Sequence, residues 1–242
     1  MTPEESQYND LLTQFGQFTI AMMILPALVA LARYRYLNKP GRVFFGYLVA
    51  TISVNLIEQL FIWSTDVNTY YSFWEPYLIR WQIDNTYFLQ ILAYLKNFLF
   101  LGWFYGLIIV PVGIGRWVFR MSVLLALLAL IDYVWISGYN QPAVLTPTLS
   151  GLYTTLLPMI QLWFLIRQQH KVSLFKIPYV WFSTGLILAN LFTLLFFLFN
   201  EKMYQTDFSL FVKMSLARNC LEIVSQFLFA YGFWQARTLR YL

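Results

Sequence analysis

Seven long apolar stretches, separated by polar connectors, make up the pattern of the chain. A helix needs about 20 apolar residues to cross the hydrocarbon core of a bilayer, and each stretch is close to that length. The pattern therefore predicts an all-α integral membrane protein with seven transmembrane helices in a single domain, residues 1–242. The predicted spans are Phe15–Tyr34, Val43–Ser64, Thr86–Ile109, Val118–Ser137, Leu149–Ile166, Ile177–Phe199 and Ser209–Trp234.

The connector Asp66–Asn85 is longer than the others and rich in aromatic residues. Tyrosine and tryptophan gather at membrane–water interfaces, where an apolar ring and a polar edge are both accommodated. We therefore expect this segment, with Tyr70, Tyr71, Trp74 and Trp81, to lie in the outer interface.

Charge agrees with the membrane class and gives an orientation. Only 11% of the residues are charged, against about 25% in soluble domains. Eleven of the 16 Lys and Arg residues fall on connectors one, three and five or on the C-terminal segment, with no acid among them. The positive-inside rule predicts an external N-terminus and a cytoplasmic C-terminus in a plasma (bacterial inner) membrane. We expect the basic patches to face lipid headgroups and no nucleic acid. They contain Arg33, Arg35, Lys39, Arg42, Arg116, Arg120, Arg167, Lys171, Lys176, Arg237 and Arg240.

Charged residues interrupt predicted spans two, three and seven. In span seven, Arg218 and Glu222 are four residues apart, so they share a helix face and are expected to pair. Ionisable groups at membrane depth usually point into the bundle, toward a partner or a cavity. Since the charges of the three spans lie at similar depths, we expect the three helices to meet around them. The candidate ligand-binding residues are Glu58, Lys96, Asn97, Arg218, Asn219 and Glu222.

The four charges in this set sum to zero and allow two interpretations. They form either a self-neutralised network that fixes how helices two, three and seven pack, or a site for a small polar or anionic solute. In the second case Lys96 and Arg218 are donors to the solute, and the carboxylates of Glu58 and Glu222 are able to take up a proton.

The chain offers little for other chemistry. Its only histidine is His170, in a basic connector, and its only cysteine is Cys220, so neither a metal site nor a histidine-based catalytic triad is expected. A retinal Schiff base needs a lysine near the middle of span seven, whereas Lys213 lies about one turn from its end. We predict a non-enzymatic protein without cofactors or metals.

An internal repeat relates spans one to three with spans five to seven. Both triplets present a proline, then an asparagine, then a basic residue followed by an asparagine. The pattern predicts two parallel three-helix units, residues 15–109 and 149–234, joined by a connector helix over 118–137. The matched residues are Pro26 with Pro158, Asn55 with Asn190, and Lys96-Asn97 with Arg218-Asn219.

This 3+1+3 arrangement with an external N-terminus resembles the PQ-loop and SWEET-type seven-helix membrane proteins. The resemblance implies a transporter in which Pro26 and Pro158 act as hinges and Asn97 and Asn219 face a central substrate pocket. Ala27 and Met159 follow the prolines, so the Pro-Gln dipeptide of that family is absent.

Three functions remain open on these grounds. A carrier of a small solute fits the repeat and the prolines. A seven-helix sensory receptor would bind a similar solute and signal through a separate membrane partner, such as a histidine kinase. A structural subunit of a larger membrane complex would use its buried charges for assembly alone.

Overall fold

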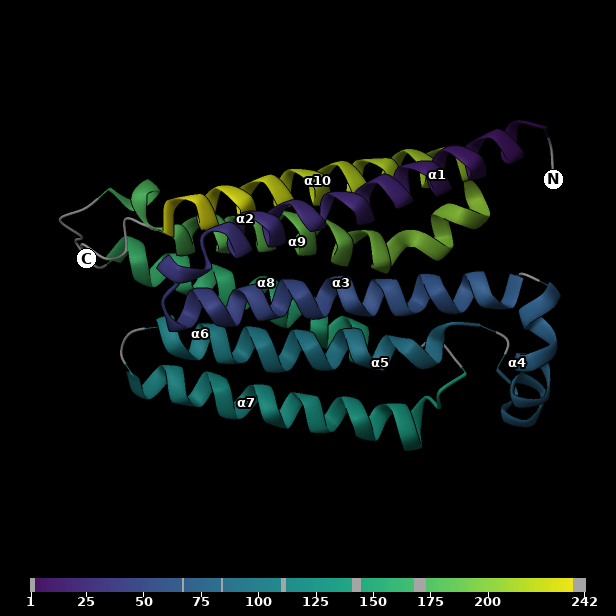
Figure 1. The fold of residues 1–242 in the computed structure, drawn as a ribbon, viewed down its shortest axis with the longest axis horizontal. Coiled ribbons are helices and arrows are strands. Elements are labelled where there is room, and N and C mark those ends of the chain that lie inside the picture. Colours follow the sequence, from purple (N-terminus) through teal and green to yellow (C-terminus); the bar gives the residue numbers. More distant parts are fainter. Residues whose placement is uncertain are drawn as a thin grey trace.

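The computed structural model of the protein describes residues 3–66, 68–83, 85–109, 112–140, 145–167 and 173–236. Throughout these ranges the regular structure is helical, and the long helices run side by side (Figure 1). Of the residues discussed above, His170, Lys171, Arg237 and Arg240 lie outside the described ranges.

Within the described residues, six helices are long and apolar enough to cross a membrane. The predicted all-α membrane class is confirmed at this level, by helix length and composition. The six are Leu11–Ala32, Lys39–Thr65, Tyr87–Ile108, Val112–Ile136, Leu145–Arg167 and Pro178–Phe196.

The six helices correspond to the first six predicted spans, three of which contain an irregular turn. Span one is divided into α1 (Pro3–Met22) and α2 (Ile24–Ala32). Span three consists of α5 (Tyr87–Lys96), the π-helical turn η2 (Asn97–Leu101) and α6 (Gly102–Ile108). Span four is α7 (Val112–Ile131) with the π-helical turn η3 (Asp132–Ile136), and it begins at Val112 rather than Val118. The other helices are α3 (Lys39–Asp66), α4 (Asn68–Trp81), α8 (Leu145–Arg167), α9 (Pro178–Thr206) and α10 (Phe208–Trp234), with 3-10 turns η1 (Tyr34–Tyr36) and η4 (Leu174–Lys176).

Helix α10 contains the seventh predicted span. Its 27 residues are sufficient to cross a bilayer, yet its polarity separates it from the six apolar helices. It carries Lys213, Arg218 and Glu222 and buries the polar side chains of Ser215, Asn219, Ser225 and Gln226. These polar side chains therefore face other helices, and α10 packs along α9 and along α1 and α2.

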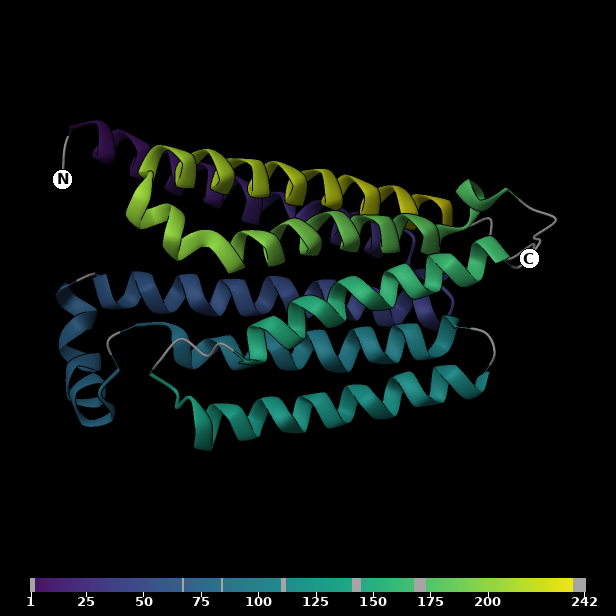
Figure 2. The ribbon, with the colours of Figure 1, turned by 180° about the vertical axis from the view of Figure 1, so that it is seen from behind.

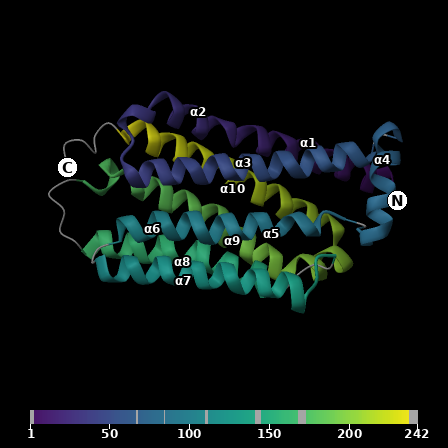
Figure 3. The ribbon, with the colours of Figure 1, turned by 60° about the horizontal axis from the view of Figure 1, so that its bottom comes forward.

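The helices form a ring. Helix α3 packs between α2 and the α5–η2–α6 segment. That segment contacts α8, and α8 contacts α9. Helix α10 closes the ring, because it packs on α9 and on the α1–α2 pair. Seen from behind, α8 crosses obliquely between the two halves of the bundle (Figure 2). Helix α7 lies at the edge of the bundle, where it packs on α6 and η2 (Figure 3).

The long aromatic connector is a separate helix, α4, which leaves the end of α3 at a steep angle (Figure 1). Phe73, Tyr77 and Trp81 follow one another at four-residue intervals, and all three side chains are exposed. A stripe of exposed aromatic rings on a short helix is typical of a segment that lies in a membrane interface.

The two predicted hinge prolines differ in their effect on the backbone. Proline lacks an amide hydrogen and clashes with the carbonyl four residues before it. Three residues before Pro26, Met23 is a turn residue that separates α1 from α2. Pro158 lies inside α8, which is continuous on both sides of it. Both prolines are buried, and hinge motion at either remains a prediction.

An aromatic cluster fills the bundle at the end where α3 and α9 begin and α10 finishes. Its centre is Phe44, whose ring stacks on Phe182 with centroids 4.3 Å apart and also contacts Phe104, Phe229 and Phe233. Phe44 and Phe233 are completely buried. This end of the bundle is therefore closed by packed rings contributed by α3, α6, α9 and α10.

Candidate functional site

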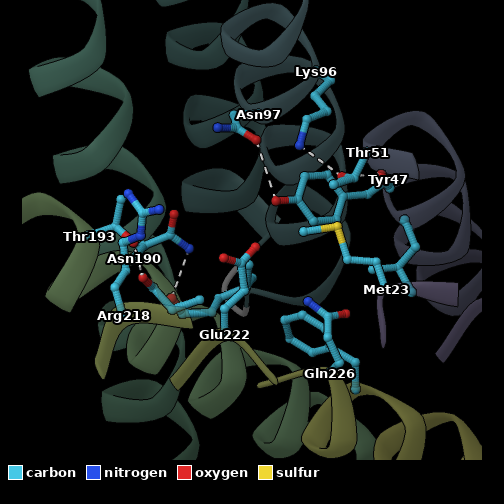
Figure 4. Close-up of a pocket in the computed structure, with 14 residues that line it drawn as sticks. Met23, Tyr47, Thr51, Lys96, Asn97, Asn190, Thr193, Arg218, Glu222 and Gln226 are labelled. Carbon is cyan, nitrogen blue, oxygen red and sulfur yellow. Dashed lines mark hydrogen bonds between the residues drawn. The ribbon is translucent and has the colours of Figure 1, made fainter. Parts of the chain in front are cut away.

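A cavity of about 270 Å³ lies inside the ring, directly beyond the aromatic cluster. Tyr47 and Phe229 belong both to the cluster and to the cavity wall, so the cluster forms its floor. The walls come from α3, the α5–η2 junction, α9 and α10, with one residue from the break between α1 and α2 (Figure 4). The lining residues are Met23, Tyr47, Leu48, Thr51, Lys96, Asn97, Leu186, Ala189, Asn190, Thr193, Arg218, Glu222, Gln226 and Phe229.

Four of the six predicted site residues line this cavity: Lys96, Asn97, Arg218 and Glu222. They come from spans three and seven, on opposite sides of the ring. Span two contributes Tyr47, Leu48 and Thr51 to the same wall as Lys96. The expectation that polar groups of helices two, three and seven gather in one place therefore agrees with the geometry.

The other two predicted residues lie outside the lining. Asn219 is buried within α10, where its side-chain oxygen accepts a long bond of 3.4 Å from Arg218 Nη2. Glu58 accepts a hydrogen bond of 2.9 Å from Thr86 Oγ1. It lies seven residues beyond Thr51 on α3, which is about 10 Å further along the helix.

Lys96 is held at the cavity by α3. Its ammonium group donates to Thr51 Oγ1 at 2.8 Å and lies 4.8 Å from the centre of the Tyr47 ring (Figure 4). A lysine cation over an aromatic face is attracted by the negative potential of the ring. The ammonium group has three N–H donors, and Thr51 takes one of them, so it retains donors for a ligand.

Asn97 begins the π-helical turn η2 and links three helices. Its amide nitrogen donates to Ser150 Oγ at 3.1 Å, and its amide oxygen accepts from Tyr47 OH at 3.4 Å. A π-helical turn inserts an extra residue into a helix and re-aims the side chains beside it, and such turns are frequent at functional sites. Here the turn begins directly after Lys96, so both residues of the predicted basic-asparagine pair reach the cavity.

The predicted Arg218–Glu222 ion pair is not found among the described residues. Glu222 makes no hydrogen bond or ion pair with any described residue, and its carboxylate points into the cavity (Figure 4). The side chain of Arg218 points away from Glu222, and its guanidinium lies 5.2 Å from the centre of the Phe196 ring. The order of the two charges is the less favourable one for pairing, because an acid four residues before a base pairs better along a helix than the reverse order present here.

The charge balance of the site also differs from the prediction. With Glu58 outside, two cations, Lys96 and Arg218, and one anion, Glu222, face the cavity, so its formal charge is 2 − 1 = +1. The four charges do not form one neutral network. A site with an excess positive charge and an unpaired carboxylate favours a ligand that brings an anionic group.

Two buried polar atoms in this region lack a partner: Arg218 Nε, a donor, and Gln226 Oε1, an acceptor. Buried polar atoms are nearly always hydrogen-bonded, so such exceptions require an explanation. Both residues line the cavity, but these two atoms are closed off from it, so a ligand there would reach them only after the side chains turn.

Some lining residues were not predicted as part of the site. Tyr47 precedes Thr51 by four residues, so the two share one face of the helix and helical spacing could have indicated Tyr47. Thr193 follows Asn190 by three residues in the same way. Met23 gave no such signal, because it lines the cavity only where the first span is interrupted.

Comparison of the chain with protein-family models, with curated proteins and with solved structures found no match. The resemblance to PQ-loop and SWEET-type proteins therefore rests on the residues quoted for it above.

Proposed function

We propose that the protein is a seven-span membrane carrier that binds a small solute with an anionic group in the central cavity. The observation that carries this proposal is the cavity itself, with Lys96, Arg218 and Glu222 around it and no ion pair between them. Charged groups are costly inside a membrane bundle, so unpaired ones beside a cavity are typical of a solute pathway.

The position and size of the cavity suit a carrier. Carriers commonly place their site near the middle of the membrane, between helices of two related units, beside interrupted helices. Here the helix break at Met23 and the π-helical turn η2 both border the cavity. The cavity, of about 270 Å³, is much larger than one water molecule requires and has room for a small solute.

The proposed repeat gains support from the ring. A twofold relation between spans one to three and five to seven requires that equivalent helices have equivalent neighbours. The first and second spans of each unit are in contact, α2 with α3 and α8 with α9. The second and third spans of each unit are also in contact, α3 with α5 and α6, and α9 with α10. The two remaining contacts, of α6 and η2 with α8 and of α10 with α2, also correspond. Lys96 and Arg218, which are counterparts in the repeat, approach one cavity from opposite walls.

The proposal includes α10 as a seventh span, with the N-terminus outside and the C-terminus in the cytoplasm. The cavity would account for the polarity of α10, since Arg218 and Glu222 face inward rather than toward lipid. Alkaline phosphatase is active only outside the cytoplasm, and green fluorescent protein folds well inside it. We expect phosphatase activity from a fusion after Tyr139, between α7 and α8, and fluorescence from a fusion after Leu242. Phosphatase activity at both positions would contradict seven spans.

Flux through reconstituted protein tests the carrier function. Small carboxylates and inorganic phosphate are first screened for their ability to raise the unfolding temperature of the purified chain, since a ligand that binds only the folded state stabilises it. Proteoliposomes are then loaded with a stabilising compound and given the labelled compound outside. We expect transient accumulation of label, absent from protein-free vesicles. Stabilisation without counterflow would instead favour the receptor function, and absence of both would refute a solute site.

A further inference from the structure

We infer that the solute is a zwitterion that carries an ammonium group next to its anionic group, as an α-amino acid does; the inference rests on the proposed function. It is drawn from two side chains of opposite charge, Lys96 on α5 and Glu222 on α10, which line the cavity from different helices.

Two charged side chains at the cavity call for opposite chemistry. The ammonium group of Lys96 keeps N–H donors beyond the one that Thr51 accepts, so it needs an acceptor from the ligand. Glu222 has no bonded partner among the described residues, so it needs a donor. A simple anion would satisfy only Lys96, and a simple amine would satisfy only Glu222. Because each buried polar group left without a partner destabilises the bound state, a ligand that provides both groups is favoured over either alone.

Glu222 is well placed to receive an ammonium group. Its carboxylate makes no hydrogen bond or ion pair with any described residue and points into the cavity (Figure 4). Both oxygens of an ionised carboxylate accept hydrogen bonds, so Glu222 can bind an ammonium group without help from a neighbouring side chain.

An α-amino acid fits this pair of groups. Its ammonium group would be held by Glu222, while its carboxylate, on the neighbouring carbon, would face Lys96 on the opposite wall. Its side chain would lie among the apolar lining residues Leu48 and Leu186. A dicarboxylate would bring a second anion to Glu222, and a diamine would bring a second cation to Arg218 and Lys96, so both are disfavoured by like-charge repulsion.

Matched analogues separate the contribution of each charge. The purified full chain, in lipid nanodiscs, is heated with leucine, with 4-methylpentanoate, which lacks the ammonium group, and with 3-methylbutylamine, which lacks the carboxylate. The corresponding triplets from alanine and phenylalanine vary the side chain. For at least one triplet we expect the amino acid to raise the unfolding temperature by about 5 °C near saturation. Its single-charge analogues should bind about tenfold more weakly or worse.

The outcomes distinguish this inference from the proposed function. If a deaminated acid binds as tightly as its amino acid and is transported, the carrier proposal stands and the zwitterion is refuted. If amino acids and carboxylates alike neither bind nor exchange, both proposals are refuted. If only the amine analogues bind, the anionic group assigned to Lys96 is wrong, and the inference is overturned.

Glu222→Gln tests the carboxylate directly, since it retains size and hydrogen bonding but removes the charge. We expect about a tenfold loss of affinity for the amino acid, and equal affinity for the amino acid and its deaminated analogue. Glu222→Asp should restore part of the preference. Lys213→Gln, an exposed position on the same helix, is the matched control and should change neither value. If Glu222→Gln does not fold, Lys96→Gln should abolish the preference for the amino acid over its amine analogue, which lacks the carboxylate. An unchanged preference in a folded variant would overturn the inference.

Discussion

Gly115→Ala is expected to lower the free energy of unfolding by about 3 kcal/mol, the upper end of the usual range for an overpacked contact. A Cβ atom on Gly115 would overlap the carbonyl oxygen of Gly106, across the contact between α7 and α6. The clashing atom belongs to the backbone, so no side-chain rotation can relieve it and the two helices must separate. Small residues at such crossings allow membrane helices to approach closely, and their packing replaces the hydrophobic effect that drives association in water.

Gly113→Ala provides the matched control for this prediction. Gly113 lies two residues away on the same helix, and a Cβ atom there would meet nothing within 4 Å. Alanine also favours a helix over glycine by up to about 1 kcal/mol, so this variant should be as stable as the parent or slightly more stable. Thermal unfolding in detergent should give a decrease of about 6–12 °C for Gly115→Ala. Equal unfolding temperatures for the two variants would show that α6 and α7 do not approach at this point.

Helix positions were more predictable than helix interruptions. The cost of leaving backbone groups unbonded in lipid forces apolar stretches of sufficient length into helices, so length and apolarity indicated the first six spans. The break at Met23 and the π-helical turns at η2 and η3 depend on how neighbouring helices pack, and a single sequence contains no local signal for a π-helical turn. Pro26 could indicate a disturbed helix, but Pro158 shows that a buried proline does not by itself interrupt one.

The site was predicted from the depth, polarity and spacing of side chains, and these criteria misplaced Glu58 and wrongly paired Arg218 with Glu222. Depth alone grouped Glu58 with the other charges, yet its partner is Thr86, at the start of α5 and away from the cavity. Spacing alone paired Arg218 with Glu222, although spacing defines only which side chains share a face. The choice between pairing and separation depends on rotamers and on nearby groups such as the Phe196 ring. Residues far apart in sequence, such as Tyr47 and Asn97, could be joined only by the folded chain.

Lys96→Met is expected to weaken binding of the stabilising carboxylate or phosphate probe by about 100-fold while making the unliganded protein more stable. Loss of a buried charged partner typically costs 2–5 kcal/mol of binding, which corresponds to factors of about 30 upward. Stability should rise because an ammonium group in a bundle interior is costly to desolvate. Methionine has similar length, and its sulfur makes favourable contacts with aromatic rings such as that of Tyr47.

The same variant decides between the two interpretations of the buried charges. Thr51 Oγ1, which accepts the lysine bond, also donates to the Tyr47 carbonyl at 2.8 Å and remains bonded without Lys96. If Lys96 belonged to a network that holds helices together, its removal would strand Glu222 and lower the unfolding temperature. If it serves a ligand, binding is lost and the temperature rises, as expected where function and stability compete. Lys213→Met, at an exposed position of α10, removes the same charge outside the cavity and should leave both measurements unchanged.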